Sequence, residues 1–299
     1  MPELRPIFVG DIQGCADELE AVLARAEERF GQGFALWCVG DVVNRGPFSL
    51  RALSRVRELV DTGRGHMVLG NHELHLLRAA AGHSPLSQLD SIGEVLEAPD
   101  AEDWIEWLRR RPIAVIGEVA GQRFAMVHAS VAPHWDLDEL EERAARVHRR
   151  LGGATRRDAE AFLAGDPAED PDLDTLLRVT TCRSVAPDGS WRSEPPDAAP
   201  PGHRAWHAEW SARRRDWGIV YGHWALQGLH VAEGLRGLDS GCVHHGRGRQ
   251  GFLTAWLPQP EGTRPFSASD GNFWQIPARR AYYLRKDVPD KTQQNEKYD

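Results

Sequence analysis

Five residues of the types that bind metal ions each follow directly on a short run of apolar residues. In chain order they are Asp11, Asp41, Asn71, His128 and His223. A glycine precedes four of them, and glycine lets the backbone turn sharply beneath the polar side chain. Carboxylate, amide and imidazole groups are the ligands of dinuclear centres, in which a bridging carboxylate joins two divalent ions about 3.5–4 Å apart. Such a pair of ions activates a water and neutralises charge on phosphoryl oxygens.

Each of these residues has an ordinary structural explanation when it is taken alone. A histidine after a strand is more often a core or surface residue than a ligand, and a Gly-Asp pair is more often a turn or a helix cap. Five ligand-type residues in succession, each at the end of a predicted strand, are not explained in this way. The sequence therefore predicts a metal centre.

The elements that must position these residues are predicted by a pattern that residues 7–80 repeat three times. A short apolar strand ends in Gly-Asp or Gly-Asn, and a loop and an amphipathic helix follow. The predicted strands cover residues 7–9, 36–39 and 67–69. Asp11, Asp41 and Asn71 recur at intervals of 30 residues, which is the length of a βαβ unit. Alternating strands and helices favour a parallel sheet with ligands at the carboxyl ends of its strands.

The second half of the chain follows a different pattern. Residues 130–215 are interpreted as an insertion in the same domain, helical at first and loop-like over the proline-rich stretch 186–204. We expect the domain to cover residues 1–258, followed by a polar extension over 259–299 whose last part, with almost no apolar residues, is disordered. Further elements are predicted as a helix at 101–110 and strands at 113–116, 124–127, 219–221, 235–238 and 252–256.

The composition of the 299-residue chain limits its environment and its partners. No apolar run approaches the roughly 18 residues of a membrane helix. No basic and apolar leader stands at the start of the sequence, so a cytoplasmic protein is expected. The four cysteines form no CxxC pair and are expected to be reduced and buried. A net charge of −8 argues against a nucleic-acid polymer as partner and leaves a small anionic substrate, held by metal ions and a few arginines.

The motifs GDIQG, GDVVNRG and GNHE, followed by His128 and His223, resemble those of the phosphoprotein-phosphatase-like metallophosphoesterases. Within that superfamily the chain is most similar to the symmetrical bis(5′-nucleosyl)-tetraphosphatases, because of the segments LEAPDAEDWIEWLRRRP and PHWDL. The matching stretches span residues 7–243. The resemblance implies an α/β fold of four layers (α/β/β/α), in which two packed sheets are flanked by helices. The mainly helical insertion at 130–215 would roof the site.

The resemblance also implies a ligand set for two divalent metal ions. Asp41 would bridge the two ions. The other ligands would be Asp11 and Gln13 for one ion, and Asn71, His128 and His223 for the second. Mn²⁺ or Co²⁺ is expected first, with Mg²⁺, Fe²⁺ and Zn²⁺ as alternatives.

Three further residues are implied to act on the substrate. His72 would donate a proton or stabilise phosphoryl charge. Arg45 would clamp a phosphate, which its planar fork of donors suits. Arg183 stands where the subfamily carries a substrate arginine, and a surface ion pair is the alternative for it.

Two residues depart from the superfamily pattern. Gln13 stands where most members have histidine, and its carbonyl oxygen is a weaker ligand than imidazole, so that metal site is expected to be looser. Asn44 stands where protein phosphatases have an aspartate that favours a protonated histidine. Because asparagine offers no full negative charge, we expect His72 to have a lower pKa and to be a weaker general acid than the same histidine in a phosphatase with the aspartate. A nucleotide phosphate, with a pKa of about 6, leaves without a proton more readily than a serine alkoxide.

These features favour hydrolysis of diadenosine tetraphosphate, a dinucleoside polyphosphate, at its centre to give two molecules of ADP. A broad-specificity phosphatase for phosphoproteins or smaller nucleotides is one alternative, and the roofing insertion argues against it. The other alternative is an inactive protein that binds dinucleotides as a sensor. Only Gln13 and Asn44 favour that second alternative.

Overall fold

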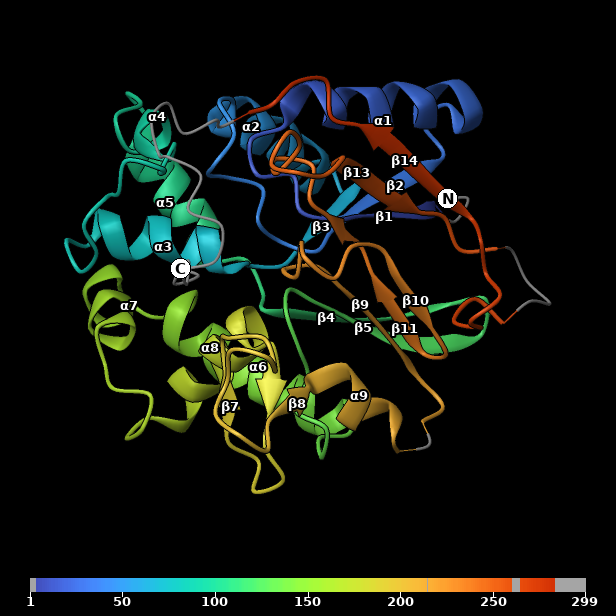
Figure 1. Cartoon of the computed structure of the whole chain (residues 1–299). Coiled ribbons are helices and arrows are strands. Elements are labelled where there is room, and N and C mark those ends of the chain that lie inside the picture. Colours follow the sequence, from blue (N-terminus) through green and yellow to red (C-terminus); the bar gives the residue numbers. More distant parts are fainter. Residues whose placement is uncertain (1–3, 214, 260–263, 283–299) are drawn as a thin grey trace.

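The computed structural model describes residues 4–213, 215–259 and 264–282. Its first sheet is built on three parallel neighbours, β1 (Arg5–Val9), β2 (Phe34–Cys38) and β3 (Gly65–Met67). Helices α1 (Ala16–Phe30) and α2 (Ser49–Asp61) connect these strands and cover one face of the sheet (Figure 1). The three predicted strands are confirmed, although β3 covers residues 65–67 rather than 67–69.

Three more strands extend this sheet beyond β1. Strand β13 (Phe252–Trp256) is antiparallel to β1. One edge of β13 pairs along its whole length with β14 (Phe273–Pro277). The other edge of β13 pairs with β1 and with β12 (Asp239–Ser240). The sheet thus continues past residue 258, where the composition suggested that the domain ends. The reason is that β14 pairs with β13 and buries the side chain of Trp274, which anchors an otherwise polar stretch of the chain. The disorder expected at the end of the chain falls on residues outside those described.

The second sheet has the strand order β10–β11–β9–β5–β4. Its centre is parallel and consists of β5 (Gln122–Val127), β9 (Gly218–Tyr221) and β11 (Leu235–Gly237). The outer strands β4 (Ala114–Val119) and β10 (His230–Ala232) are antiparallel to their neighbours. The β4–β5 hairpin is the strand pair that the sequence predicts.

The two sheets pack face to face through large apolar side chains. In β1, Phe8 points to the second sheet, and its ring centroid lies 5.2 Å from that of Phe124 in β5. Its neighbours Ile7 and Val9 belong instead to the core that includes helices α1 and α2. This alternation is the two-residue period of a strand. Helices lie on the outer sides of both sheets (Figure 1), so the expected α/β/β/α architecture is confirmed.

The insertion between β5 and β9 is mainly helical, as expected. It also contains a small antiparallel sheet, β7–β6–β8, in and around the stretch 186–204 that was expected to be a loop. Strands of two residues carry too little periodicity to be recognised in a sequence. The elements are α6 (Leu137–Leu151), α7 (Arg156–Leu163), α8 (Pro171–Thr181), β6 (Ser184–Val185), β7 (Trp191–Arg192), β8 (Arg204–Ala205) and α9 (Trp206–Ser211).

Three helices lie between β3 and β4, namely α3 (Asn71–Ala80), α4 (Gly93–Leu96) and α5 (Ala101–Arg109). Helix α3 starts at Asn71, so the GNHE motif forms its first turn. Within the described ranges, every helix is too short or too polar to cross a membrane.

Candidate active site

The backbone around the predicted ligands is strained. Among the described residues, six other than glycine have a positive φ, and five of those belong to this region. They are Gln13, Asp41, Asn44, Arg45 and His223. Such conformations cost on the order of 1–3 kcal/mol each and persist mainly at functional sites. Their concentration at successive strand ends marks these loops as a site rather than as ordinary turns.

Two of the glycines that precede ligands are required by the close approach of a carboxylate. A β-carbon on Gly70 would lie 2.1 Å from Asp41 Oδ1, and one on Gly222 would lie 2.0 Å from Asp11 Oδ1. The Asp11 oxygens in turn accept the backbone N–H of His223 at 3.1 and 3.2 Å. The glycines therefore let each carboxylate lie against the backbone of a neighbouring strand end.

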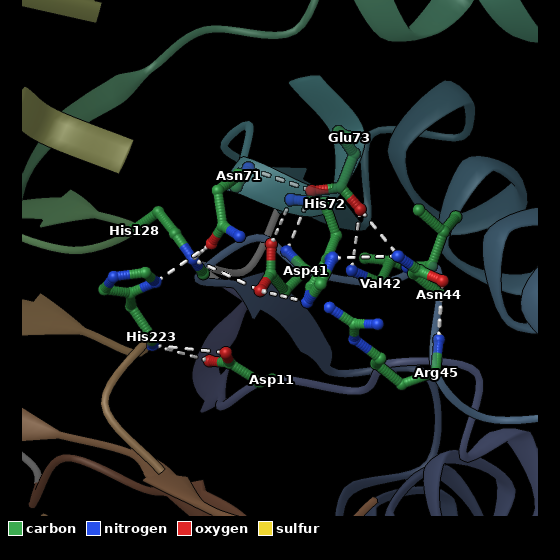
Figure 2. Close-up of polar contacts among 12 residues, drawn as sticks. Asp11, Asp41, Val42, Asn44, Arg45, Asn71, His72, Glu73, His128 and His223 are labelled. Atoms are coloured by element: carbon green, nitrogen blue, oxygen red, sulfur yellow. Dashed lines mark hydrogen bonds and ion pairs between the residues drawn. The ribbon is translucent and has the colours of Figure 1, made fainter. Parts of the chain in front are cut away.

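The two histidines present lone pairs to the same point (Figure 2). His128 Nδ1 donates to the carbonyl oxygen of Val39 at 2.9 Å, and His223 Nε2 donates to that of Thr181 at 2.9 Å. Because a carbonyl only accepts, Nε2 of His128 and Nδ1 of His223 carry lone pairs in the neutral rings. These two nitrogens lie 3.0 and 2.9 Å from Asn71 Oδ1. Three acceptors that converge in this way fit a divalent cation.

Asp41 provides the negative charge of this centre. Its Oδ2 lies 3.4 Å from His128 Nε2, and ligand atoms of Asp41, His128 and His223 all lie within 4.8 Å of one another. Burial opposes the ionisation of Asp41, but His128 and His72 outweigh it and hold the pKa of Asp41 well below its ordinary value. Burial likewise opposes a charged His128, but Asp41 raises the pKa of that ring. The centre thus favours positive charge beside the Asp41 carboxylate.

Three more buried carboxylates surround Asp41. Burial is the main cause that raises the pKa of Asp11, and the charges of Asp239 and Asp41 add to it. Burial, followed by the charge of Asp41, raises the pKa of Glu73 to about 7. Burial also raises the pKa of Asp239 to about 6. Buried acids that repel one another are stabilised by multivalent cations, so this environment fits divalent metal ions.

Glu73 organises the loop that carries Asp41. One of its carboxylate oxygens accepts the N–H groups of Gly70 and Asp41 at 2.9 and 2.8 Å. The other accepts those of Val42 and Val43 at 2.8 and 3.2 Å. A carboxylate that satisfies four backbone donors is committed to the fold, which separates Glu73 from the ligand set.

Gln13, two residues after Asp11, is held in the first loop through its backbone. Gln13 is buried, and its backbone N–H donates to the carbonyl oxygen of Asp41 at 2.8 Å. This contact ties the first ligand loop to the second. The side chain of Gln13 as a metal ligand stays a prediction.

Most of this chain is similar in sequence to known proteins. The profile of the calcineurin-like phosphoesterase family matches residues 4–248. A relative from Ralstonia nicotianae, named "bis(5′-nucleosyl)-tetraphosphatase, symmetrical", is 39% identical over 258 residues, which cover 81% of this chain and 87% of the relative. A relative of the same name from Chromohalobacter salexigens is 41% identical over 255 residues, covering 80% and 90%. The chain is a calcineurin-like phosphoesterase of the symmetrical bis(5′-nucleosyl)-tetraphosphatase family.

Solved structures share the fold of this phosphoesterase. The crystal structure of a candidate diadenosine tetraphosphatase superposes with a TM-score of 0.58 at 24% identity, covering 92% of this chain and 94% of that one. A protein serine/threonine phosphatase from Saccharomyces cerevisiae superposes with a TM-score of 0.50 at 12% identity, covering 97% and 82%. At these identities the likeness concerns the fold alone, and it agrees with the four-layer architecture.

In this phosphoesterase, Asn44 sets the orientation of His72. Asn44 Oδ1 accepts the backbone N–H of Arg45 at 2.8 Å and that of Ser91 at 2.9 Å, so its Nδ2 faces His72. Nδ2 lies 3.0 Å from His72 Nδ1 and donates to it. A neutral His72 therefore carries its proton on Nε2, which lies 3.7 Å from Asp41 Oδ2. Burial is the main cause that lowers the pKa of His72 to about 4. The lower pKa expected from asparagine in place of aspartate at position 44 stays a prediction.

Asp90 is a site residue that sequence reasoning missed. Its Oδ1 accepts Asn44 Nδ2 at 2.9 Å, and its Oδ2 accepts the N–H of Ser87 at 2.6 Å and lies 3.1 Å from His75 Nε2. A guanidinium nitrogen of Arg45 is 3.8 Å away. Burial opposes ionisation, but these hydrogen bonds hold the pKa of Asp90 well below its ordinary value. Asp90 thus anchors Asn44 and faces Arg45, from a loop that no motif distinguishes.

Arg183 reaches the centre from the insertion. One of its guanidinium nitrogens donates to the carbonyl oxygen of His223 at 3.1 Å, and the other donates to that of Ser193 at 2.8 Å. Burial lowers the pKa of Arg183, while Asp239 and Asp41 act in the opposite direction. Arg183 therefore lies beside the predicted metal ligands, and among the described residues it contacts backbone carbonyl oxygens rather than the surface ion pair considered as its alternative. Its action on the substrate stays a prediction.

Replacing Asp239 with Asn is expected to stabilise the metal-free protein above about pH 6. The pKa of Asp239 is raised from 3.8 to about 6, so the stability that its proton provides is lost as the pH rises through this range. Asn cannot lose that proton, and it can still accept the Gly241 N–H that Asp239 Oδ1 accepts at 3.0 Å. The free energy of unfolding should rise by on the order of 1–3 kcal/mol.

Thermal unfolding in a chelator at about pH 8 measures this effect, and at about pH 4 the two proteins should unfold alike. With saturating Mn²⁺ at about pH 8, the wild type should instead melt at a higher temperature than D239N, because the Asp239 carboxylate then faces cations. A lower melting temperature for metal-free D239N than for the wild type at about pH 8 would contradict the prediction.

Proposed function

We propose that this chain hydrolyses diadenosine tetraphosphate at its centre and releases two molecules of ADP. The observation that carries the proposal is the hydrogen bond from Asn44 Nδ2 to His72 Nδ1, 3.0 Å long, beside the cluster of metal ligands. It makes His72 a neutral donor, which suits a leaving group that needs no proton. The relatives named symmetrical bis(5′-nucleosyl)-tetraphosphatases support the same substrate class.

The metal ions of this reaction would be held by Asp11, Gln13, Asp41, Asn71, His128 and His223. A mixture of imidazole and oxygen donors suits Mn²⁺ and Co²⁺, and it also admits Mg²⁺, Fe²⁺ and Zn²⁺. When bound, two such ions supply Lewis-acid charge and an activated water at neutral pH.

The side chains of the protein would bind and orient the phosphates. Figure 2 shows the guanidinium of Arg45 directed toward the space beside His72, where it would clamp an inner phosphate. The Nε2–H group of His72 would donate a hydrogen bond to a phosphoryl oxygen or to the leaving oxygen. Arg183 would meet a phosphate from the side of the insertion.

The leaving group decides between an anhydride and an ester substrate. The terminal phosphate of ADP has a pKa of about 6 and departs as an anion near neutral pH. A serine alkoxide must receive a proton in the transition state, and a histidine whose pKa is about 4 is rarely protonated at pH 7. The neutral state of His72 therefore favours the phosphoanhydride.

The insertion favours a small substrate. Helix α8 ends at Thr181, whose carbonyl oxygen accepts His223 Nε2 at 2.9 Å, and Arg183 follows almost at once. The insertion thus borders the metal ligands and would roof the site. We infer a cytoplasmic enzyme whose partner is a soluble dinucleoside polyphosphate, rather than a phosphoprotein, a nucleic-acid polymer or a membrane surface.

Chromatography of the digestion products tests the proposal. The metal-free enzyme is supplied in turn with Mn²⁺, Co²⁺, Mg²⁺, Fe²⁺ and Zn²⁺ and incubated with diadenosine tetraphosphate. ADP is expected as the only product. AMP together with ATP would overturn symmetrical cleavage, and faster turnover of a phosphoserine peptide would overturn the substrate class. Tight binding of the dinucleotide without turnover in any metal would favour the sensor.

Replacing Asn44 with Asp is expected to shift the enzyme toward phosphoesters. A carboxylate beside His72 Nδ1 favours the imidazolium, which protonates a poor leaving group. The ratio of kcat/KM for a phosphoserine peptide to that for the dinucleotide should rise about tenfold or more. The new carboxylate would face Asp90, which now accepts Asn44 Nδ2 at 2.9 Å.

The double variant N44D/D90N controls for that repulsion, because Asp90→Asn restores a donor opposite the new carboxylate. It should show the same shift in preference with better retention of total activity. An unchanged ratio in both variants would mean that residue 44 does not set the leaving-group preference.

A further inference from the structure

A second group of metal-ligand atoms lies beside α1 and contains none of the active-site ligands. The sulfur atoms of Cys15 and Cys242 and a carboxylate oxygen of Glu18 all lie within 4.8 Å of one another. The three side chains are 0%, 1% and 0% exposed, respectively. Cys15 immediately precedes α1, Glu18 lies in its first turn, and Cys242 follows β12. The group therefore joins segments that are far apart in the sequence.

Glu18 is a buried carboxyl group without a cationic partner among the described residues. Its Oε1 accepts the backbone N–H of Arg279 at 2.7 Å, and its Oε2 accepts the hydroxyl of Tyr282 at 2.5 Å. None of the ion pairs within the described part of the chain involves Glu18. A buried carboxylate is costly unless positive charge compensates it, and two neutral donors compensate it only in part.

Among the described residues, the thiol of Cys15 has only weak partners, one of which is the thiol of Cys242. The sulfur of Cys15 lies 3.9 Å from the carbonyl oxygen of Gln13, which is a weak hydrogen bond. A thiol exchanges its proton for a metal ion readily, and thiolate sulfur prefers soft or borderline cations such as Zn²⁺ over Mg²⁺ or Mn²⁺. The cluster thus offers two displaceable protons and an uncompensated carboxylate at one buried point.

We propose that Cys15, Glu18 and Cys242 bind one thiophilic divalent cation of the Zn²⁺ class, separate from the active-site ions. With zinc bonds of about 2.3 Å to sulfur, tetrahedral geometry places two sulfurs about 3.8 Å apart, so donors within 4.8 Å need only small side-chain movements. Binding releases both thiol protons to solvent. The resulting site, two thiolates and one carboxylate around a divalent ion, carries a single negative charge.

Such an ion would connect three segments that support the active site. Cys15 lies in the loop that carries Asp11, and Cys242 follows Asp239 in the loop after β12. The third segment follows β14, passes over α1 in Figure 1 and holds Glu18 through Arg279. The ion would therefore be structural, and its place is independent of which substrate the enzyme cleaves.

Cobalt titration of the reduced, metal-free protein under anaerobic conditions tests the proposal. Thiolate bound to Co²⁺ gives a charge-transfer band in the near ultraviolet, whereas oxygen and imidazole ligands do not. We expect a band that saturates at one cobalt ion per chain, yields to stoichiometric Zn²⁺ and resists excess Mn²⁺. The band should persist in Asp41→Asn, in which the active-site ions bind poorly.

Substitutions of the cysteines locate the band. The variants C15S and C242S should each lose it, while C38S and C182S, which remove the other two buried cysteines, should keep it. Native mass spectrometry should find one zinc ion fewer in the C15S/C242S double variant than in the wild type. The absence of a charge-transfer band in wild-type protein, or its loss on addition of Mn²⁺, would overturn the proposal even if the serine variants failed to fold.

Discussion

Replacing Asp41 with Asn is expected to lower turnover of diadenosine tetraphosphate by a factor on the order of 10³ or more, because both metal ions would lose their shared anionic ligand. The isosteric amide can keep the contact in which Asp41 Oδ1 accepts the backbone N–H of His72 at 2.9 Å. The fold should therefore survive. The change removes the carboxylate that lies 3.4 Å from His128 Nε2 and places an amide at the centre of the ligand set.

Metal analysis after gel filtration checks the cause of that loss. The wild type should retain two ions per chain from Mn²⁺, and D41N should retain fewer. The matched control is Asp138→Asn, because the side chain of Asp138 is 82% exposed and, among the described residues, pairs with Arg123 alone at the surface. D41N with full metal content and wild-type turnover would show that Asp41 is not the bridging ligand.

The strand-end residues proposed as ligands can be recognised in the sequence because their signal is local. Asp11 and Asp41 each follow an apolar strand and a glycine, and the glycine before a carboxylate reflects a real contact: a β-carbon on Gly70 would lie 2.1 Å from Asp41 Oδ1. The repeated pattern also fixed the parallel sheet, since strands joined by helices bring their carboxyl ends together. The two packed sheets followed from the resemblance rather than from the pattern, whereas strand order and register were not predicted and come from the structure.

The parts that were missed depend on long-range contacts. Asp90 acts through Asn44, which is 46 residues away in the chain, and nothing in its own surroundings distinguishes it from a loop aspartate. The strand β14 is a short apolar segment within an otherwise polar stretch and is held by pairing with β13, so the composition of the stretch resembled that of an extension. The strands β6, β7 and β8 have two residues each and exist only as a set.

The backbone strain and the buried acids describe the same property of the site. Positive φ values at Asp41 and His223 cost free energy, and so does the burial of Asp11 beside other carboxylates. Neither cost brings any gain to a protein that only needs to fold. Both are explained if the loops are shaped for bound cations, whose binding free energy offsets them.

Replacing His72 with Gln is expected to lower kcat for diadenosine tetraphosphate by roughly 10²-fold, toward the lower end of the 10²–10⁴ that proton-transfer groups contribute. The reason is its neutral state: the pKa of His72 is lowered to about 4, chiefly by burial, and bound cations would lower it further. At pH 7, His72 is then expected to stabilise charge through a hydrogen bond from its Nε2–H group rather than to donate a proton. The factor by which H72Q lowers kcat for a phosphoserine peptide should be no larger than the factor for the dinucleotide.

The pH profile separates this role from general-acid catalysis. If His72 is neutral, its deprotonation should not lower kcat between about pH 6 and 8, since its pKa is about 4. The pH profiles of the wild type and H72Q should therefore have the same shape in this range. The exposed His83, whose backbone N–H donates to Arg78, gives the matched control H83Q, which should behave as wild type. The opposite result is a wild-type kcat that falls above about pH 6.5 while the kcat of H72Q does not. It would mean that His72 acts as the imidazolium and that Asn44 does not hold it neutral.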